Sequence, residues 1–291
     1  ALLIRGDLRA QVGDGLRRGW RRAVARQQLP PHPGPPHPAA AHAHTTPHSP
    51  YKRVLLKLSG EAFCKAGGSG IEAEELGLIA SEIKDAYATG DGGVGGVQLA
   101  VVVGGGNFVR GARFAKQAHI HQATADYMGM LATMMNGLAL KEALLHIGVD
   151  SRVMTAIDVR AVAEPFIRGR AIRHMEKKRI VILVAGTGNP FCTTDTCAAL
   201  RATELECELL MKATKVDGVY TADPKKDPTA TKFDKLTFSE SLAKNLAVMD
   251  MTALAMCQEN KIPVLVFDFK RPGNIKAVMQ GKTLGTMITP P

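Results

Sequence analysis

Three glycine-containing loops hold residue types that can bind a phosphate group. They are "KLSG" at 57–60, "GGGNFVRG" at 104–111 and "GTGNP" at 186–190, and each follows a short apolar run. Glycines let backbone N–H groups approach an anion closely, and the N-terminus of a following helix adds partial positive charge. Because such apolar runs predict buried parallel strands, whose carboxyl ends meet at one edge of a sheet, we expect the three loops to converge on one ligand site.

Two basic residues near these loops could neutralise a phosphate. Lys57 stands close to the end of the apolar run "VLLKLSG", so its ammonium group must either find a partner or reach solvent from the strand end. Arg110 lies four residues after Gly106 and is either a second phosphate ligand or an ordinary surface arginine. We predict that Lys57 is the main cation and that Arg110 assists it.

The segment "GTGNPFCTTD" at 186–195 ends in groups suited to phosphates and cations, yet it contains no lysine. Thr193 and Thr194 offer hydroxyl donors, although threonines also serve as helix caps and turn residues. Asp195 could pair with a lysine or with Mg²⁺, or it could cap a helix that begins near Thr196. If this segment holds a phosphate, the positive charge must come from other loops.

A fourth segment, "KATKVDGVYTADP" at 212–224, follows another apolar run. It places Tyr220 and Asp223 after a turn, and an aromatic ring beside a carboxylate suits an adenine and ribose pocket. The dipeptide Asp217-Gly218 is by itself only a turn signal.

Known phosphate-binding patterns do not account for these loops. None matches G-x-x-x-x-G-K-[ST], and the glycine spacing is a weak match to a dinucleotide-binding fold. The characteristic motifs of protein kinases are also missing from the sequence. The pattern favours a phosphate site whose cations lie on neighbouring loops.

The elements that must position these loops alternate between strands and helices. We predict strands at 52–60, 97–107, 151–156, 179–186, 208–214 and 262–269, and helices at 72–87 and 126–145. Apolar residues recur at helical spacing in the first helix, and a methionine-rich stripe in the second is typical of core packing. This order is typical of an α/β protein with a mainly parallel sheet.

The composition is that of an ordinary globular protein. Hydrophobic residues make up 45% and charged residues 22% of the 291 residues, and the sequence contains no apolar run of a length that would span a membrane. Five cysteines without zinc-site spacing favour a reducing compartment over a disulfide framework.

The first 50 residues differ from the rest of the chain. They carry seven arginines against two aspartates, which is half of the net charge of +10, and their second half is rich in proline and histidine. We predict a disordered N-terminal extension over 1–50, either a transit peptide or a solvated tail. With one aromatic residue and no lysine, it does not suggest nucleic-acid binding. Residues 51–291 are expected to form a single domain.

Six motifs in order resemble the bacterial-type uridylate kinases of the amino acid kinase superfamily. They are "YKRVLLKLSGEA", "GGGNFVRG", "DYMGMLATMMNGLA", "AGTGNPFCTTD", "KATKVDGVYTADPKKDPTAT" and "VMDMTA", between about 51 and 288. The resemblance implies a three-layer α/β/α sandwich, a homohexamer, and transfer of the γ-phosphoryl group of Mg·ATP to UMP. "VAEPFIRGRAIRHMEKKR" and "CQENKIPVLVFDF" look like the cyanobacterial and plastid branch, which implies a chloroplast protein; the alternative is the cytoplasm.

The resemblance also implies roles for individual residues. Lys57, Asp195 and Arg110 would be catalytic, with Asp195 orienting Lys57. The ATP site would comprise Lys57, Ser59, Gly60, Gly106, Arg110, Lys212, Thr214, Tyr220 and Asp223. The UMP site would comprise Gly105, Asp126, Thr187, Gly188, Asn189, Pro190, Phe191, Cys192, Thr193 and Thr194. Mg²⁺ would arrive with ATP, and Asp195 and Asp250 could organise it through water.

The chain departs from the family pattern in a few places. Cys192 stands where the family usually has phenylalanine, and the glycine-rich loop at 89–96 is longer than expected. Residues 65–70 match by position a segment linked to GTP activation in some bacterial members, but glycine loops vary freely and this match does not establish the effect. The resemblance gives GTP and UTP as possible effectors. Two alternatives stay open: a related kinase acting on a carboxylate or carbamate, and a nucleotide-binding regulator without catalysis.

Overall fold

The computed structural model describes residues 49–87, 96–109, 119–224, 226–244, 246 and 248–290. Residues 1–48 of the expected extension, nearly all of the loop at 89–96, and Arg110 lie outside the described residues. The expectations for them, and for a single domain over 51–291, therefore stay predictions.

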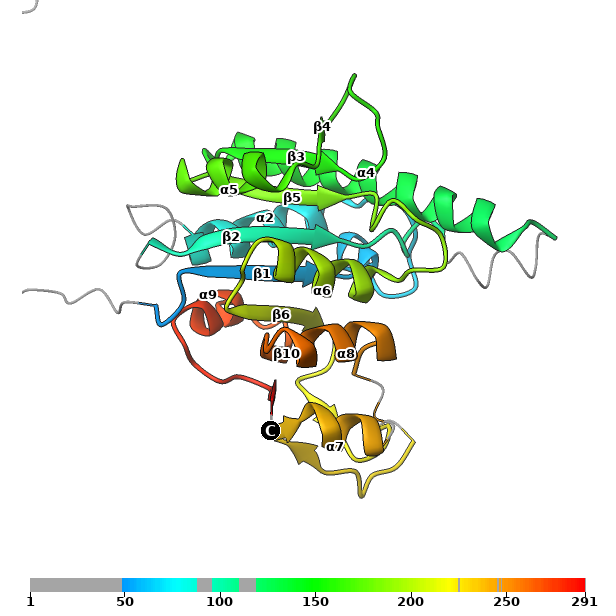
Figure 1. Cartoon of the computed structure of the whole chain (residues 1–291), viewed down its shortest axis with the longest axis vertical. Helices are drawn as coiled ribbons and strands as arrows, with labels where there is room; N and C mark the ends of the chain where they lie inside the picture. The colour runs from blue at the N-terminus through cyan, green and yellow to red at the C-terminus, as the bar shows by residue number, and fades with distance from the viewer. Residues whose placement is uncertain are drawn as a thin grey trace, which may run out of the picture. The chain divides into compact units, whose positions relative to one another are not determined.

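The described strands form one large, mainly parallel sheet (Figure 1). Its strand order is β4-β3-β5-β2-β1-β6-β10-β11-β9, and only the β10–β11 pair is antiparallel. The strands are β1 (Arg53–Leu58), β2 (Gln98–Val103), β3 (Ser151–Thr155), β4 (Glu164–Pro165), β5 (Ile180–Val184), β6 (Leu209–Thr214), β9 (Lys235–Thr237), β10 (Val264–Asp268) and β11 (Thr286–Thr289). A separate antiparallel pair consists of β7 (Val219–Tyr220) and β8 (Lys232–Phe233).

Helices cover both faces of this sheet and complete three layers. The first face packs against α2 (Ala73–Tyr87), α4 (Gln122–His146) and α9 (Asn274–Met279). The second face packs against α5 (Arg168–Glu176), α6 (Thr194–Glu204), α7 (Phe238–Ala243) and α8 (Met251–Glu259). The predicted α/β/α sandwich is therefore confirmed.

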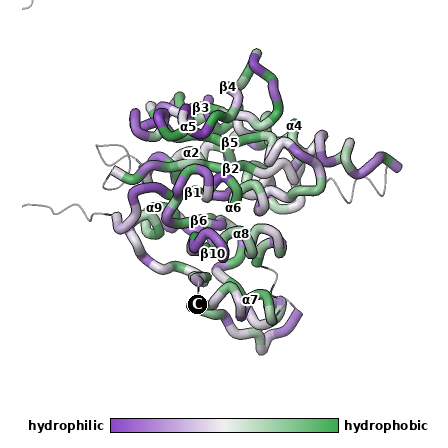
Figure 2. The backbone as a smooth tube through the Cα atoms, viewed as in Figure 1, coloured by the Kyte–Doolittle hydropathy of each residue, from purple (hydrophilic) through white to green (hydrophobic). Residues whose placement is uncertain are grey.

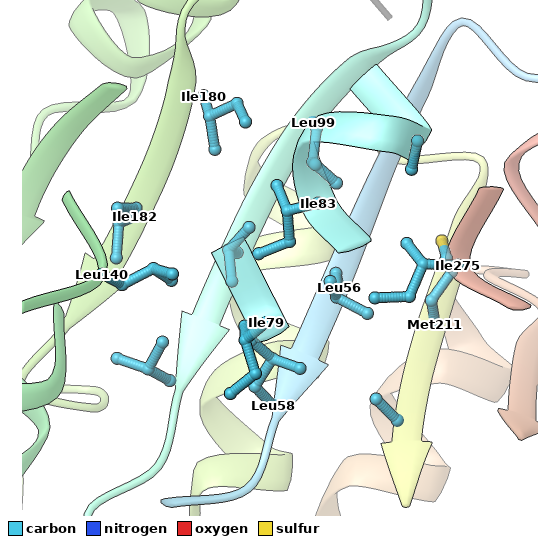
Figure 3. Close-up of a cluster of buried hydrophobic side chains, with 14 of the residues drawn as sticks. Leu56, Leu58, Ile79, Ile83, Leu99, Leu140, Ile180, Ile182, Met211 and Ile275 are labelled. Atoms are coloured by element: carbon cyan, nitrogen blue, oxygen red, sulfur yellow. The ribbon is translucent and has the colours of Figure 1, made fainter. Parts of the chain in front are cut away.

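The central strands read as continuous apolar runs because both of their faces are buried. Figure 2 shows the hydrophobic stretches along β2 and β5. On the first face, Ile79 and Ile83 of α2 lie over Leu58 and Leu56 of β1 (Figure 3). This packing and the parallel register bring the carboxyl ends of these strands to one edge of the sheet.

The six predicted strands and two predicted helices are present with somewhat different ends. For example, the second helix begins at Gln122, four residues before the predicted start at Asp126. The shorter elements β4, α5, β7, β8, β9, α7, α8, α9 and β11 were not predicted. Among the described residues, no helix is long and apolar enough to cross a membrane.

Candidate active site

The loops after β1 and β2 meet at the carboxyl edge of the sheet. A Cβ atom added to Gly60 would lie 2.5 Å from the Gly106 backbone nitrogen, and one added to Gly104 would lie 2.8 Å from the Gly60 nitrogen. The two backbones therefore approach each other at a distance that only glycine permits. Ser59 accepts a hydrogen bond from the Glu61 N–H and caps the short 3-10 helix η2 (Gly60–Phe63), which fixes the first loop.

A buried cluster of three charged side chains lies at the same edge. Lys57 of β1 and Lys212 of β6 are partners in the strand register, so both side chains leave the sheet on the face covered by α6. The Lys57 Nζ lies 2.9 Å from Asp195 Oδ1, and the Lys212 Nζ lies 2.6 Å from Asp195 Oδ2. The three side chains are only 12–15% exposed. The cluster places two cations against one carboxylate.

Electrostatics in this cluster favour an anionic ligand. Burial alone would raise the pKa of Asp195, but Lys57 and Lys212 outweigh burial and hold its pKa below the ordinary value of 3.8. Burial, together with the neighbouring ammonium of Lys57, lowers the pKa of Lys212 below 10.5 despite the opposing attraction of Asp195. Because one carboxylate cannot balance two buried ammonium groups, a phosphate at this position would supply the missing negative charge.

The N-terminus of α6 positions Asp195. Thr193 is the N-cap: its Oγ1 accepts hydrogen bonds from the N–H groups of Asp195 and Thr196 at 3.0 and 3.1 Å. Asp195 is thus a first-turn residue of a helix that starts at Thr194, and the alternative that it caps a helix starting near Thr196 is wrong. Its carboxylate is free to point at the lysines.

Asp250 joins this helix start to α8. Its carboxylate caps α8 through the Ala253 N–H at 2.9 Å and accepts hydrogen bonds from Thr193 Oγ1 at 2.5 Å and from Thr196 Oγ1 at 3.1 Å. The backbone carbonyl of Val248, two residues earlier, accepts a hydrogen bond from Lys212 Nζ.

One cavity is lined by the loop after β2, by α4 and by the segment that leads from β5 into α6. Its volume is about 390 Å³. It is lined by Gly105, Gly106, Val109, Gln122, Asp126, Gly129, Met130, Thr133, Gly186, Thr187, Asn189, Phe191, Cys192, Thr193 and Thr194. We call it the acceptor cavity, because it contains most of the residues expected to hold UMP. Gly188 and Pro190 belong to the same loop but are not among the lining residues.

Asp126 ties the loop of the acceptor cavity to α4. Its Oδ2 accepts a hydrogen bond from the Phe191 backbone N–H at 2.9 Å, and its Oδ1 accepts one from Gln122 Nε2 at 2.7 Å. Phe191 has a positive φ of 64° and a side chain that is 71% exposed. Cys192 follows it and is also exposed. The loop is therefore held by its backbone while its side chains remain accessible.

A second cavity has Lys212 in its lining. We call it the donor cavity, because it contains Lys212, Thr214, Tyr220 and Asp223, four of the residues expected to hold ATP. Its volume is about 560 Å³, and it is lined by Lys212, Thr214, Val216, Gly218, Val219, Tyr220, Thr221, Ala222, Asp223, Pro224, Lys244, Leu246, Val248 and Val266. The Tyr220 hydroxyl donates to Asp217 Oδ1 at 2.7 Å, and Thr214 Oγ1 donates to the Val216 carbonyl at 2.7 Å. These bonds fix one wall of the cavity.

Sequence reasoning missed several residues that support these cavities. Asn107 and Asn136 are buried and exchange side-chain hydrogen bonds of 2.9 and 2.7 Å, and Asn136 also donates to the Gly104 carbonyl at 2.7 Å. Thr133 Oγ1 accepts a hydrogen bond from the Ala185 N–H at 2.7 Å. For Thr133 and Asn136 the detectable signal was a polar side chain on the buried, otherwise apolar face of α4, whereas Asn107 belongs to the glycine loop after β2.

The carboxylates of the site, Asp195 and Asp250, do not form a dedicated metal centre. Within the described ranges, no three His, Cys, Asp or Glu side chains gather in a way that could hold a metal ion. Asp195 is engaged by two lysines, and Asp250 by two threonines and a helix N-terminus. Mg²⁺ commonly stays hydrated and binds through substrate phosphates with one or two carboxylates, so these residues fit an ion carried by a nucleotide.

Comparison with known proteins agrees with this geometry. The model of the amino acid kinase family matches residues 52–268, and the chain belongs to that family. Within it, the chain is similar to the UMP kinase from Bacillus anthracis, with 38% identity, a TM-score of 0.78, and coverage of 82% of this chain and 96% of that one. The UMP kinase from Ureaplasma parvum has 38% identity and a TM-score of 0.75, covering 82% and 98%. The uridylate kinase from Archaeoglobus fulgidus has 29% identity and a TM-score of 0.61, covering 81% and 99%. The expected membership is confirmed.

Proposed function

We propose that this chain is a UMP kinase that transfers the γ-phosphoryl group of ATP to UMP, producing UDP and ADP. One observation carries the proposal: the Lys57–Asp195–Lys212 cluster lies between the two cavities. Lys212 lines the donor cavity, and Asp195 directly follows Thr194, which lines the acceptor cavity. A phosphoryl group passing between the cavities would move past two buried ammonium groups.

The chemistry places little demand on a general base. A nucleoside monophosphate is largely dianionic near neutral pH, because its second pKa is about 6. The reactive oxygen is therefore already deprotonated, and the main barrier is repulsion between two anions. In-line positioning and cations at the transferred group lower this barrier. Lys57 and Lys212 neutralise the transferred group, while Asp195 holds both ammonium groups in place.

The two cavities take different nucleotides. The acceptor cavity receives UMP, with its phosphate on the glycine loop and Thr193–Thr194 and its ribose near Asp126. The donor cavity receives the nucleoside part of ATP beside Thr214, Tyr220 and Asp223, with the phosphates reaching Ser59, Gly60 and Gly106. Bound to the triphosphate, Mg²⁺ would neutralise part of its charge. Arg110 would add a further cation.

Regulation and location belong to the same proposal. A third cavity of about 420 Å³ has Lys141, Arg152 and Arg160 in its lining, together with Glu164. Each of the three cations is paired with a neighbouring carboxylate, so the phosphates of a GTP or UTP effector would have to displace these pairs. The arginine-rich N-terminal extension supports import into a chloroplast. Fusion of residues 1–50 to a fluorescent protein tests this location, and fluorescence that stays in the cytoplasm contradicts it.

An acceptor panel tests the proposed activity. ADP release from ATP is measured with UMP, CMP, dUMP, N-acetylglutamate, aspartate and carbamate. We expect turnover with UMP and none with the carboxylates or carbamate. A preference for a carboxylate or carbamate would assign the chain to another activity of the family. No turnover with any acceptor would favour a nucleotide-binding regulator.

A further inference from the structure

Asp250 connects two helix N-termini that belong to different parts of the site. Its carboxylate caps α8 and also accepts hydrogen bonds from Thr193 and Thr196 at the start of α6. Thr196 is 6% exposed, so its hydroxyl bond to Asp250 is shielded from water. One carboxylate thus satisfies three donors from two helices, which is more than capping requires.

The segment Val248–Asp250 also lies between the two cavities. Val248 lines the donor cavity and accepts a hydrogen bond from Lys212, while Asp250 holds Thr193, which lines the acceptor cavity. A ligand in the donor cavity would contact Val248. Two residues later in the same segment, Asp250 contacts Thr193 at the acceptor cavity, so ordering of this segment would be felt at both cavities. The backbone from Val248 to Asp250 joins the two contacts, with a hydrogen bond to Lys212 at one end and hydrogen bonds to Thr193 and Thr196 at the other.

We propose that Asp250 is a positioning residue that couples the two nucleotide sites: a nucleotide in the donor cavity strengthens binding of the acceptor through the Val248–Asp250 segment and Thr193. This inference rests on the proposed function. The physical basis is shared ordering, because a second ligand loses less conformational entropy when the first has already ordered a common element. The coupling is reciprocal by thermodynamic linkage.

ADP is the suitable probe for the donor cavity. It does not react with UMP, and it lacks the γ-phosphoryl group that would repel the UMP phosphate. The Kd of UMP is measured by calorimetry with the full chain, in the absence and presence of saturating Mg·ADP. We expect ADP to lower the Kd of UMP by a factor in the range of about 5 to 150, which is typical of coupling between sites.

The variant Asp250→Ser isolates the link. Serine is as good an N-cap as aspartate, so α8 keeps its cap, but the shorter side chain loses the hydrogen bonds to Thr193 and Thr196. Both Kd values of UMP are measured for the variant, at Mg·ADP concentrations shown to saturate it, and we expect the ratio of the value without ADP to the value with ADP to fall towards onefold. Thr196→Val removes one hydroxyl from the other end of the link and should reduce the coupling in part. It serves as a second test if Asp250→Ser does not fold.

A capping variant outside the cavities controls for general loss of stability. Thr237 caps α7 through the Glu240 N–H, and Thr237→Ala should lower stability without changing the coupling. Undiminished coupling in both Asp250→Ser and Thr196→Val overturns the inference, as does a wild-type protein in which ADP leaves the Kd of UMP unchanged. If the wild type neither binds nor phosphorylates UMP, the proposed function fails and the inference fails with it. If the wild type phosphorylates UMP but the variants keep their full coupling, the inference fails and the proposed function stands.

Discussion

At the residue scale, Lys57 and Lys212 are placed where lysine is costly. Each interrupts an apolar strand, and each is almost fully covered by protein. Burying two ammonium groups against one carboxylate disfavours the free protein and favours one that has bound an anion. We interpret this excess of positive charge as the feature that draws phosphoryl groups into the site.

Replacing Lys57 tests its role in neutralising the transferred group. In Lys57→Ala, Asp195 keeps its pair with Lys212, so the fold should be retained. We expect kcat to fall by about 100- to 1,000-fold, as when a group that stabilises transition-state charge is removed, while the Kd of UMP changes little. Steady-state kinetics and calorimetry measure the two quantities. The exposed Lys282→Ala is the matched control, and near-normal turnover in Lys57→Ala would refute the role.

The pH dependence of kcat/KM tests the charge on Lys212. Burial lowers the pKa of Lys212 below 10.5, so the free enzyme should lose this positive charge at a lower pH than an exposed lysine would. We expect kcat/KM for ATP to fall on the alkaline side with an apparent pKa below 10.5, since this ratio reports the free enzyme. In Lys212→Arg the cation stays charged, and this alkaline fall should disappear. The same profile in both proteins would rule out Lys212 as its source.

Part of the site was predictable from the sequence. Lys57 was identified because a lysine inside an apolar run needs a partner, and Asp195 because it closes a glycine loop. The partnership of Lys212 with Asp195 was not foreseen, because it depends on β1 and β6 being neighbours in a matching register. The order of strands in a sheet depends on how distant segments of the chain pack together, so it cannot be read from the sequence around any one strand. The effect of Cys192 stays untested.

At the scale of elements, the glycine loop after β2 packs closely against α4. A Cβ atom added to Gly105 would lie 2.6 Å from the Gly129 carbonyl oxygen and 2.9 Å from the Ala132 Cβ, whereas one added to Gly106 would meet nothing within 4 Å. The first position is therefore a packing contact between the loop after β2 and the helix. The second is an open backbone position facing the site.

Two alanine substitutions test this distinction. Gly105→Ala should push the loop away from α4 and lower the free energy of unfolding by about 1–3 kcal/mol, the usual cost of overpacking. Gly106→Ala should leave the free energy of unfolding nearly unchanged, because its added methyl group has room. Denaturant unfolding measures both. Equal stability of the two variants would show that the loop is not held against α4.

Most of the strands that were predicted share one property. Strands β1, β2, β5, β6 and β10 consist mostly of apolar residues, so their burial on both faces is visible in the sequence, whereas β3 (SRVMT) has only a short apolar centre. The missed strands β4, β9 and β11 have two to four residues and lie towards the ends of the sheet, where pairing rather than composition determines the structure.

At the scale of the whole molecule, α4 carries an apolar stripe on its outer side. Tyr127, Leu131 and Met135 are spaced at i, i+4 and i+8 and are 44%, 49% and 46% exposed. Exposed apolar stripes of this kind mark surfaces that contact other proteins. The sequence resemblance implies a homohexamer, and we propose that this stripe forms part of the contact between its copies. The stripe begins beside Asp126, so assembly would also bear on the acceptor cavity.

A charged residue in the stripe tests the assembly. Leu131→Asp should break the contact between copies, because an unpaired carboxylate would be buried in an apolar interface. Sedimentation should show a hexamer for the wild type and smaller species for the variant. Leu78→Asp, at an exposed position on α2, is the matched control and should sediment like the wild type. A wild-type monomer, or a Leu131→Asp hexamer, would contradict the proposed assembly.

The most direct test of the account follows the transferred phosphoryl group itself. The full chain is incubated with Mg·ATP labelled at the γ-phosphorus and with UMP, and the products are separated and identified. The account predicts that the label appears as the β-phosphoryl group of UDP, with one ADP formed per UDP, and that Lys57→Ala abolishes nearly all of this transfer. Label recovered as inorganic phosphate, or on an acceptor other than UMP, would contradict it.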